Sequence, residues 1–231
     1  MKASLILSCV AFVSVVVGVG AVGRASVLPL NNSDFEQGPI FPTVPPTGWV
    51  LSANPNTAGV VTITAGTSQY VTLPDGATSG TDKVFFANAA SPILLRNVTP
   101  YTFHDGDTYT VSMDIGGRKD ITQTFNHISV SLFGIDSNSV IHHVLSQSYV
   151  NPTDFTAGFG NWTHVSTSAA LPFSSGADGL AIYLDINFVG GNQPNIDNVM
   201  LEQTTTPIPE PASLGLLMLG SVIMLRRRRS I

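Results

Sequence analysis

The segment Tyr109-Thr110-Val111-Ser112-Met113-Asp114-Ile115 is the clearest indication of the fold class, because apolar and polar side chains alternate along it. Successive side chains of a β-strand point to opposite faces, so the four apolar side chains would share the face toward the core. Residues 127–133, with the sequence His-Ile-Ser-Val-Ser-Leu-Phe, repeat the pattern. Both stretches therefore predict strands with one buried and one solvated face.

Similar short runs recur between the two ends of the chain. They are rich in Val, Ile, Thr, Phe and Tyr and are separated by Gly, Pro, Asn and Asp, which are typical of turns. Helical spacing with capping residues is nowhere sustained. We therefore predict an all-β fold in which two antiparallel sheets pack as a jelly-roll sandwich. The predicted strands include residues 60–64, 68–73, 83–87, 93–98, 108–115, 127–133, 140–150, 162–170, 180–188 and 195–202.

Four segments of this region carry a family resemblance. The first is Leu30-Asn31-Asn32-Ser33-Asp34-Phe35-Glu36, followed by Gly48-Trp49. Residues 103–114 and Asn161-Trp162-Thr163 come next, and Asn195-Ile196-Asp197-Asn198-Val199-Met200-Leu201-Glu202 closes the region. In this order they resemble galactose-binding-like jelly rolls, which include many carbohydrate-binding modules. Ser33 departs from the pattern, which usually has glycine there. The resemblance implies the same two-sheet fold.

Acidic side chains lie near both ends of the predicted sandwich. They would converge if the first and last strands lie side by side, and carboxylate and carbonyl oxygens are the ligands that Ca²⁺ takes. The resemblance implies a structural calcium ion at this place, with Glu36 and Asp197 as ligands. The alternative is that Asp34 and Asp197 only cap turns through bonds from their side chains to the backbone.

Carbohydrate binding needs an exposed aromatic face with amide or carboxylate groups beside it. The candidates are Tyr70, Tyr149 and Trp49. Tyr70 and Tyr149 have polar neighbours, which predicts exposure. The alternative for each aromatic side chain is packing in the core, and the resemblance favours the core for Trp49 and Trp162.

The C-terminal segment has three parts. Pro209-Glu210-Pro211 precedes an apolar run, residues 212–225, and the run ends in Arg226, Arg227, Arg228 and Arg229. The prolines keep the tripeptide extended, the apolar run predicts a transmembrane helix, and the arginines hold the chain end on the cytoplasmic side. This order resembles the PEP-CTERM sorting signal of exported bacterial proteins. The resemblance implies recognition by an exosortase, a membrane cysteine transpeptidase that acts near Pro-Glu-Pro. The alternative is a plain membrane anchor.

The N-terminus predicts export as well. Lys2 is followed by the uncharged apolar run 5–22, and Gly23-Arg24-Ala25 offers small residues to a signal peptidase. We predict a signal peptide over residues 1–25 that is cleaved after Ala25. The alternative is an uncleaved N-terminal anchor.

The predicted domain organisation separates the charges. Residues 26–203 form the sandwich, residues 204–208 a linker and residues 209–231 the sorting signal. Once residues 1–25 and 209–231 are set aside, four basic side chains face fourteen of the fifteen acidic ones, and Glu210 is the fifteenth. The domain is therefore strongly acidic, which disfavours nucleic acid as a partner. It has no cysteine, so a packed core must supply its stability.

No catalytic motif stands out. The sequence lacks G-x-S-x-G and H-E-x-x-H, and the neighbours His142 and His143 would point to opposite faces of a strand. We expect an exported, non-catalytic module of the cell envelope or the extracellular (biofilm) matrix, transiently anchored in the inner membrane, that binds extracellular polysaccharide. The alternatives are a small secreted glycan-active hydrolase and a structural matrix protein without a defined ligand.

Overall fold

The computed structural model describes residues 23–38, 40, 45–52, 58–88, 92–120, 127–150, 160–190 and 193–205. The predicted signal helix and the C-terminal segment 209–231 lie outside these residues and stay predictions. Within the described part, no helix is long and apolar enough to cross a membrane. Residues 23–206 form one compact unit.

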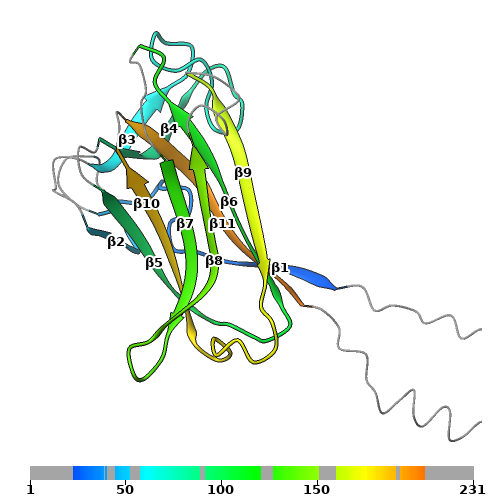
Figure 1. Ribbon diagram of the computed structural model, residues 1–231. Coiled ribbons are helices and arrows are strands. Elements are labelled where there is room, and N and C mark those ends of the chain that lie inside the picture. Colours follow the sequence, from blue (N-terminus) through cyan, green and yellow to red (C-terminus); the bar gives the residue numbers. More distant parts are fainter. Residues whose placement is uncertain are drawn as a thin grey trace, which may run out of the picture. The chain divides into compact units, whose positions relative to one another are not determined.

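Two antiparallel sheets make up this unit (Figure 1). Sheet A has the strand order β3-β4-β11-β6-β9, and β1 also pairs with β11. Sheet B has the order β2-β5-β10-β7-β8. The strands of sheet A are β1 (Arg24–Leu28), β3 (Ala58–Thr64), β4 (Thr81–Ala87), β6 (Thr108–Gly117), β9 (Trp162–Ala170) and β11 (Pro194–Thr205). Those of sheet B are β2 (Trp49–Ser52), β5 (Ile93–Thr102), β7 (His127–Ile135), β8 (Ile141–Val150) and β10 (Ala181–Val189). The predicted all-β, two-sheet class is confirmed.

The hydrophobic core lies between the sheets, where the alternating side chains meet. Tyr109, Val111, Met113 and Ile115 of β6 are all buried, as their spacing predicts. Ile128, Val130 and Leu132 of β7 are fully buried on the facing sheet. The hydrophobic effect on these paired faces is the main stabilising contribution to the sandwich.

A second, smaller core lies on the other side of β3 and β4. Its buried members are Ile63, Ala65, Tyr70, Leu73 and Val84, with Trp162 packed against them. Residues 65–80, which connect β3 to β4, supply three of these side chains. The predicted strand at residues 68–73 is therefore wrong: this segment forms turns, and its alternating apolar residues cover the sheet instead of extending it. The prediction that β6 has one solvated face is wrong as well, because Ser112, Asp114 and Gly116 are buried.

Trp162 fixes one position in β6. A Cβ atom at Gly116 would lie 2.5 Å from the Trp162 ring, so only glycine allows this approach. The indole N–H donates to the carbonyl oxygen of Thr72 at 3.1 Å, which ties the β3–β4 connection to β9. The resemblance placed Trp162 in or near the core, and it is half-buried against the second core.

Both ends of the sandwich are longer than the sequence predicts. Arg24 and Ala25 pair with Thr205 and Thr204, so β1 begins before the predicted cleavage site and β11 takes the first two residues assigned to the linker. Cleavage after Ala25, if it occurs there as predicted, would leave three of the five β1 residues to pair with β11. The first and last strands lie side by side, as the prediction for the acidic residues requires.

Candidate functional site

The β3–β4 connection is held in place by its own backbone and by the sheet beneath it. The Thr67 hydroxyl accepts hydrogen bonds from the N–H groups of Gln69 and Tyr70 and donates to the carbonyl of Thr64. The N–H of Val71 donates to the carbonyl oxygen of Gly160 at 2.7 Å. Such local side-chain bonds stabilise a turn and aim the next side chain inward. The result is a fixed orientation for Gln69 and Tyr70.

This connection borders a cavity of about 240 Å³ on sheet A. The floor comes from β3 and β4, and the walls come from the connection and from the residues next to β6 and β11. Aromatic, aliphatic, amide and guanidinium groups all contribute. The lining residues are Val61, Thr62, Ile63, Gln69, Tyr70, Phe86, Arg118 and Gln193.

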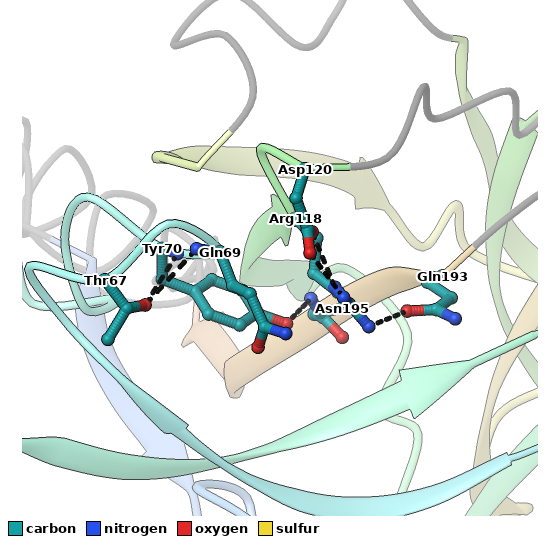
Figure 2. Close-up of polar contacts among 7 residues, drawn as sticks. All are labelled: Thr67, Gln69, Tyr70, Arg118, Asp120, Gln193 and Asn195. Atoms are coloured by element: carbon teal, nitrogen blue, oxygen red, sulfur yellow. Dashed lines mark hydrogen bonds and ion pairs between the residues drawn. The ribbon is translucent and has the colours of Figure 1, made fainter.

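A chain of polar contacts crosses this cavity (Figure 2). The Arg118 guanidinium lies between Asp120 and Gln193: Nε and Nη2 donate to the Asp120 carboxylate at 2.9 and 2.7 Å, and Nη1 donates to Gln193 Oε1 at 3.0 Å. The hydrogen bond from Arg118 is the main reason that the pKa of Asp120 is lowered. Arg118 is thereby held in one orientation.

Tyr70 is the buried wall of the cavity, and its phenol points toward Asn195 (Figure 2). Its oxygen accepts a hydrogen bond from Asn195 Nδ2 at 2.9 Å. Burial raises the Tyr70 pKa to about 12, so the phenol keeps its proton at neutral pH. Asn195 is fully buried, and its Oδ1 has no hydrogen-bond partner among the described residues. A phenol O–H and an unused amide acceptor therefore lie next to the cavity.

The sequence-predicted aromatic residues do not come together. Tyr70 and Tyr149 are 4% and 7% exposed, so the prediction that they are solvent-exposed is wrong. Tyr149 faces the main core on β8, and Trp49 is in the same core, with its indole N–H donating to the carbonyl of Asn32 at 3.1 Å. Core packing, the alternative reading, holds for both. Of the three, Tyr70 lines the cavity.

Sequence reasoning missed Arg118, Gln193 and Phe86. Arg118 and Gln193 are about 75 residues apart and meet only because β6 and β11 pair. The one available signal was that Arg118 is among the few basic residues of a strongly acidic domain.

A third acid, Asp82, interacts with both of the predicted calcium ligands, Glu36 and Asp197. The Asp82 carboxyl hydrogen bonds with Glu36, and burial together with this bond raises the Asp82 pKa to about 6. Glu36 also accepts from the N–H of Lys83 at 3.0 Å, while Lys83 Nζ donates to the Glu36 carbonyl at 2.7 Å. Asp82 is the second residue of β4, and only the fold brings this position near Glu36 and Asp197.

Asp197 is the buried member of this group. It is 2% exposed, and its Oδ1 has no hydrogen-bond partner among the described residues. Its pKa is raised to about 8, chiefly because burial disfavours the charged form; the backbone N–H of Asn198 opposes the shift, and the carboxylates of Asp82, Asp114 and Asp34 add to it. Carboxylate oxygens, one of which is buried and accepts no hydrogen bond from the described residues, are suitable ligands for a hard cation such as Ca²⁺. However, no three histidine, cysteine or acidic side chains of the described residues are arranged as a ready metal site.

One pair resembles catalytic geometry. Asp114 Oδ1 lies 2.8 Å from His164 Nδ1, and Asp114 Oδ2 accepts from Asn198 Nδ2 at 2.9 Å. A catalytic pair of this kind works only together with a nucleophile that the histidine activates. His142 and His143 are also separate, since His142 contacts Asp136 and His143 packs on Phe133.

The outer face of sheet B carries a cluster of charged and aromatic side chains that contact one another. Arg96 makes a two-pronged ion pair with Asp185 at 2.6 and 2.7 Å. Its guanidinium lies over the rings of Phe133 and Tyr183, which stack at 5.3 Å. These contacts stabilise the centre of the sheet.

The family comparison concerns the C-terminal segment. Residues 207–229 match the model of the PEP-CTERM protein-sorting motif. The chain carries a PEP-CTERM sorting motif. This confirms the resemblance seen in Pro209-Glu210-Pro211 and the arginines that follow the apolar run. No curated protein is significantly similar to the chain.

Solved structures share the fold of the domain that precedes the PEP-CTERM motif. A cyclase from Fischerella sp. TAU is 15% identical with a TM-score of 0.61, over 80% of this chain and 100% of the cyclase. The xylan-binding domain CBM22-1 of Paenibacillus barcinonensis Xyn10C is 10% identical with a TM-score of 0.47, over 81% of this chain and 100% of that domain. The structural neighbours thus include carbohydrate-binding modules as well as an enzyme. At these identities the likeness concerns the fold alone.

Proposed function

We propose that this chain is an exported bacterial protein, processed by an exosortase at its PEP-CTERM motif, whose sandwich binds a carbohydrate without catalysis. Its place is the cell envelope or the extracellular matrix, after a transient stay in the inner membrane. The observation that carries the binding function is the cavity on sheet A, in which apolar faces and hydrogen-bonding groups lie together.

The chemistry of the lining suits a sugar. Phe86, Val61 and Ile63 offer apolar surface to the C–H face of a pyranose ring. Gln69, Gln193 and Arg118 offer donors and acceptors to its hydroxyl groups. Ligand pockets for drug-sized molecules usually start at about 300 Å³. A cavity of about 240 Å³ therefore fits one sugar unit of a longer polymer.

Replacing Phe86 by alanine is expected to weaken glycan binding about tenfold, because a lost aromatic contact of about 1.4 kcal/mol corresponds to that factor. The measurement is affinity electrophoresis of residues 23–206, which hold both hydrophobic cores, in gels containing neutral polysaccharides.

The matched control is Phe173→Ala, because Phe173 is 67% exposed and lies on the β9–β10 connection, away from the cavity. If both variants and the parent were retained equally, the cavity would not be the binding site. Cleavage of a retained polysaccharide would support the hydrolase alternative, and no retention of any polysaccharide would support a structural matrix protein.

Replacing Glu210 by alanine in the full chain is expected to block processing, since the Pro-Glu-Pro tripeptide is the part of the tail that a plain anchor does not need. The intact mass of the protein from the cell envelope would then retain the C-terminal segment. A lysine in place of Arg229 keeps the charge and serves as the control. Normal processing of the Glu210→Ala protein would argue for a plain anchor.

We also propose that Glu36 and Asp197 bind a structural calcium ion. The unused buried Oδ1 of Asp197 supports this proposal, as does the presence of further carboxylates beside it. Backbone carbonyls would have to complete the six to eight oxygen ligands that calcium takes.

A further inference from the structure

Among the described residues that line the cavity, Arg118 is the charged one, and the domain around it is strongly acidic. An arginine in a binding site usually indicates an acidic ligand, because its guanidinium matches a carboxylate or phosphate. Here the partner of that guanidinium already belongs to the protein: Asp120 lies 2.7 Å from Nη2.

The contacts of Arg118 leave a defined set of donors. A guanidinium has five N–H groups. Two of them bond to Asp120 and one to Gln193, and the part of the chain that the structure describes gives the other two no hydrogen-bond partner. The edge formed by Nε and Nη2, which an incoming carboxylate would use in the side-on geometry, is taken. The two remaining N–H groups suit neutral oxygen acceptors such as the hydroxyls of a sugar.

Asp120 also sets the charge at this place. Its carboxylate cancels the charge of Arg118, and its lowered pKa keeps it ionised at neutral pH. An acidic sugar would have to displace Asp120 or sit beside it, within an acidic domain, and like charges at short range are unfavourable.

We propose that Asp120 determines the charge selectivity of the cavity: it fixes Arg118 as a neutralised donor, so that uncharged sugar units bind and uronic acids are excluded. This inference rests on the proposed carbohydrate-binding function. Asp120 contributes by positioning Arg118 and by repelling anions.

The test is Asp120→Asn in residues 23–206, because the amide still accepts one hydrogen bond from Arg118 but carries no charge. Retention is measured in gels with neutral polysaccharides (soluble starch, β-glucan, xylan and galactan) and with polygalacturonate, at low salt and at high salt. The parent is expected to be retained by a neutral polymer, with a retention that depends little on salt. It is not expected to be retained by polygalacturonate. The variant is expected to gain at least tenfold in retention by polygalacturonate, and to lose the gain at high salt.

Two further variants test whether the effect of Asp120→Asn is local and depends on Arg118. Glu202→Gln removes one charge on β11 outside the cavity and should leave the preference unchanged, which separates a local effect from net charge. Asp120→Asn combined with Arg118→Gln should lose the gain. If Asp120→Asn melts early, Asp120→Ser is measured in its place.

The two proposals fail in different ways. Retention of the parent by polygalacturonate as strongly as by a neutral polymer would overturn the selectivity inference and leave carbohydrate binding in place. An unchanged preference in the folded Asp120→Asn variant would do the same. No retention of the parent or variants by any polymer would overturn the proposed function and the inference together.

Discussion

In EDTA, the domain is expected to lose stability as the pH rises from about 4 to about 8, because Asp197 has a pKa of about 8 when folded and an ordinary value of 3.8 when unfolded. Between these values the folded state holds a proton that the unfolded state releases, so a rise in pH favours unfolding. Below about pH 4 the group is protonated in both states and has no effect. The change from 3.8 to about 8 corresponds to a loss on the order of 5 kcal/mol by pH 8.

Calcium is expected to reverse this dependence. A bound cation stabilises the ionised carboxylate, so in millimolar Ca²⁺ the melting temperature should stay level or rise over the same pH range. Thermal melting followed by circular dichroism, in EDTA and in calcium, measures the pH dependence of the melting temperature under both conditions. Identical curves with EDTA and with calcium would contradict the proposed metal site, whereas a flat curve in EDTA would contradict the burial of an unpaired Asp197.

The variant Asp197→Asn separates the two effects. Without its charge, the side chain should make the domain more stable than the parent in EDTA at pH 8 and less stable than the parent in calcium. Asp178→Asn is the control, because Asp178 is exposed and only accepts a hydrogen bond from the N–H of Asp105. It should follow the parent under both conditions.

Replacing Phe35 by alanine is expected to lower the free energy of unfolding by about 3–5 kcal/mol, the usual cost of removing a fully buried aromatic side chain. Phe35 is 0% exposed, and its ring lies 5.5 Å from Trp49 and 5.7 Å from Phe85. Urea denaturation of residues 23–206 measures the change.

The effect should extend to the acidic group. Phe35 holds the segment that carries Asp34 and Glu36 against the sandwich, and Ser33 in that segment accepts the N–H of Val199 at 2.9 Å. The variant should therefore also lose part of the stabilisation by calcium. Phe173→Ala, at an exposed position, should change the free energy of unfolding by less than about 0.5 kcal/mol. A loss below about 1 kcal/mol in Phe35→Ala would contradict the packing of this ring in the core.

The strands were predictable where one face meets the core and the other meets water or polar groups. Alternation in residues 108–115 and 127–133 named the side chains of β6 and β7 that face the main core correctly, because a period of two is the signature of a strand. The same rule failed at residues 68–73. There the apolar side chains cover the second core from a turn, and local sequence does not distinguish covering a sheet from extending it. The short strands β1 and β2 carry too few residues for a pattern.

The sites divide in the same way. Glu36 and Asp197 were named from a pattern at the two ends of the domain, and the pairing of β1 with β11 places those ends side by side. Asp82 was not named, because nothing in its surroundings marks it. Tyr70 was named for the wrong reason: its polar neighbours predicted exposure, whereas they form the turn that buries it.

The all-β class, the core-facing sides of the long strands and the PEP-CTERM motif could be read from the sequence, since each depends on residues that are close together in the chain. The cavity and its charge could not, because they arise only when distant segments fold against one another. Tyr70, Arg118 and Asn195 come from three separate parts of the chain, and the pairing of β11 with β6 and β4 brings them together. Contacts of this kind follow from strand order and register, and those depend on how the whole apolar surface is buried at once.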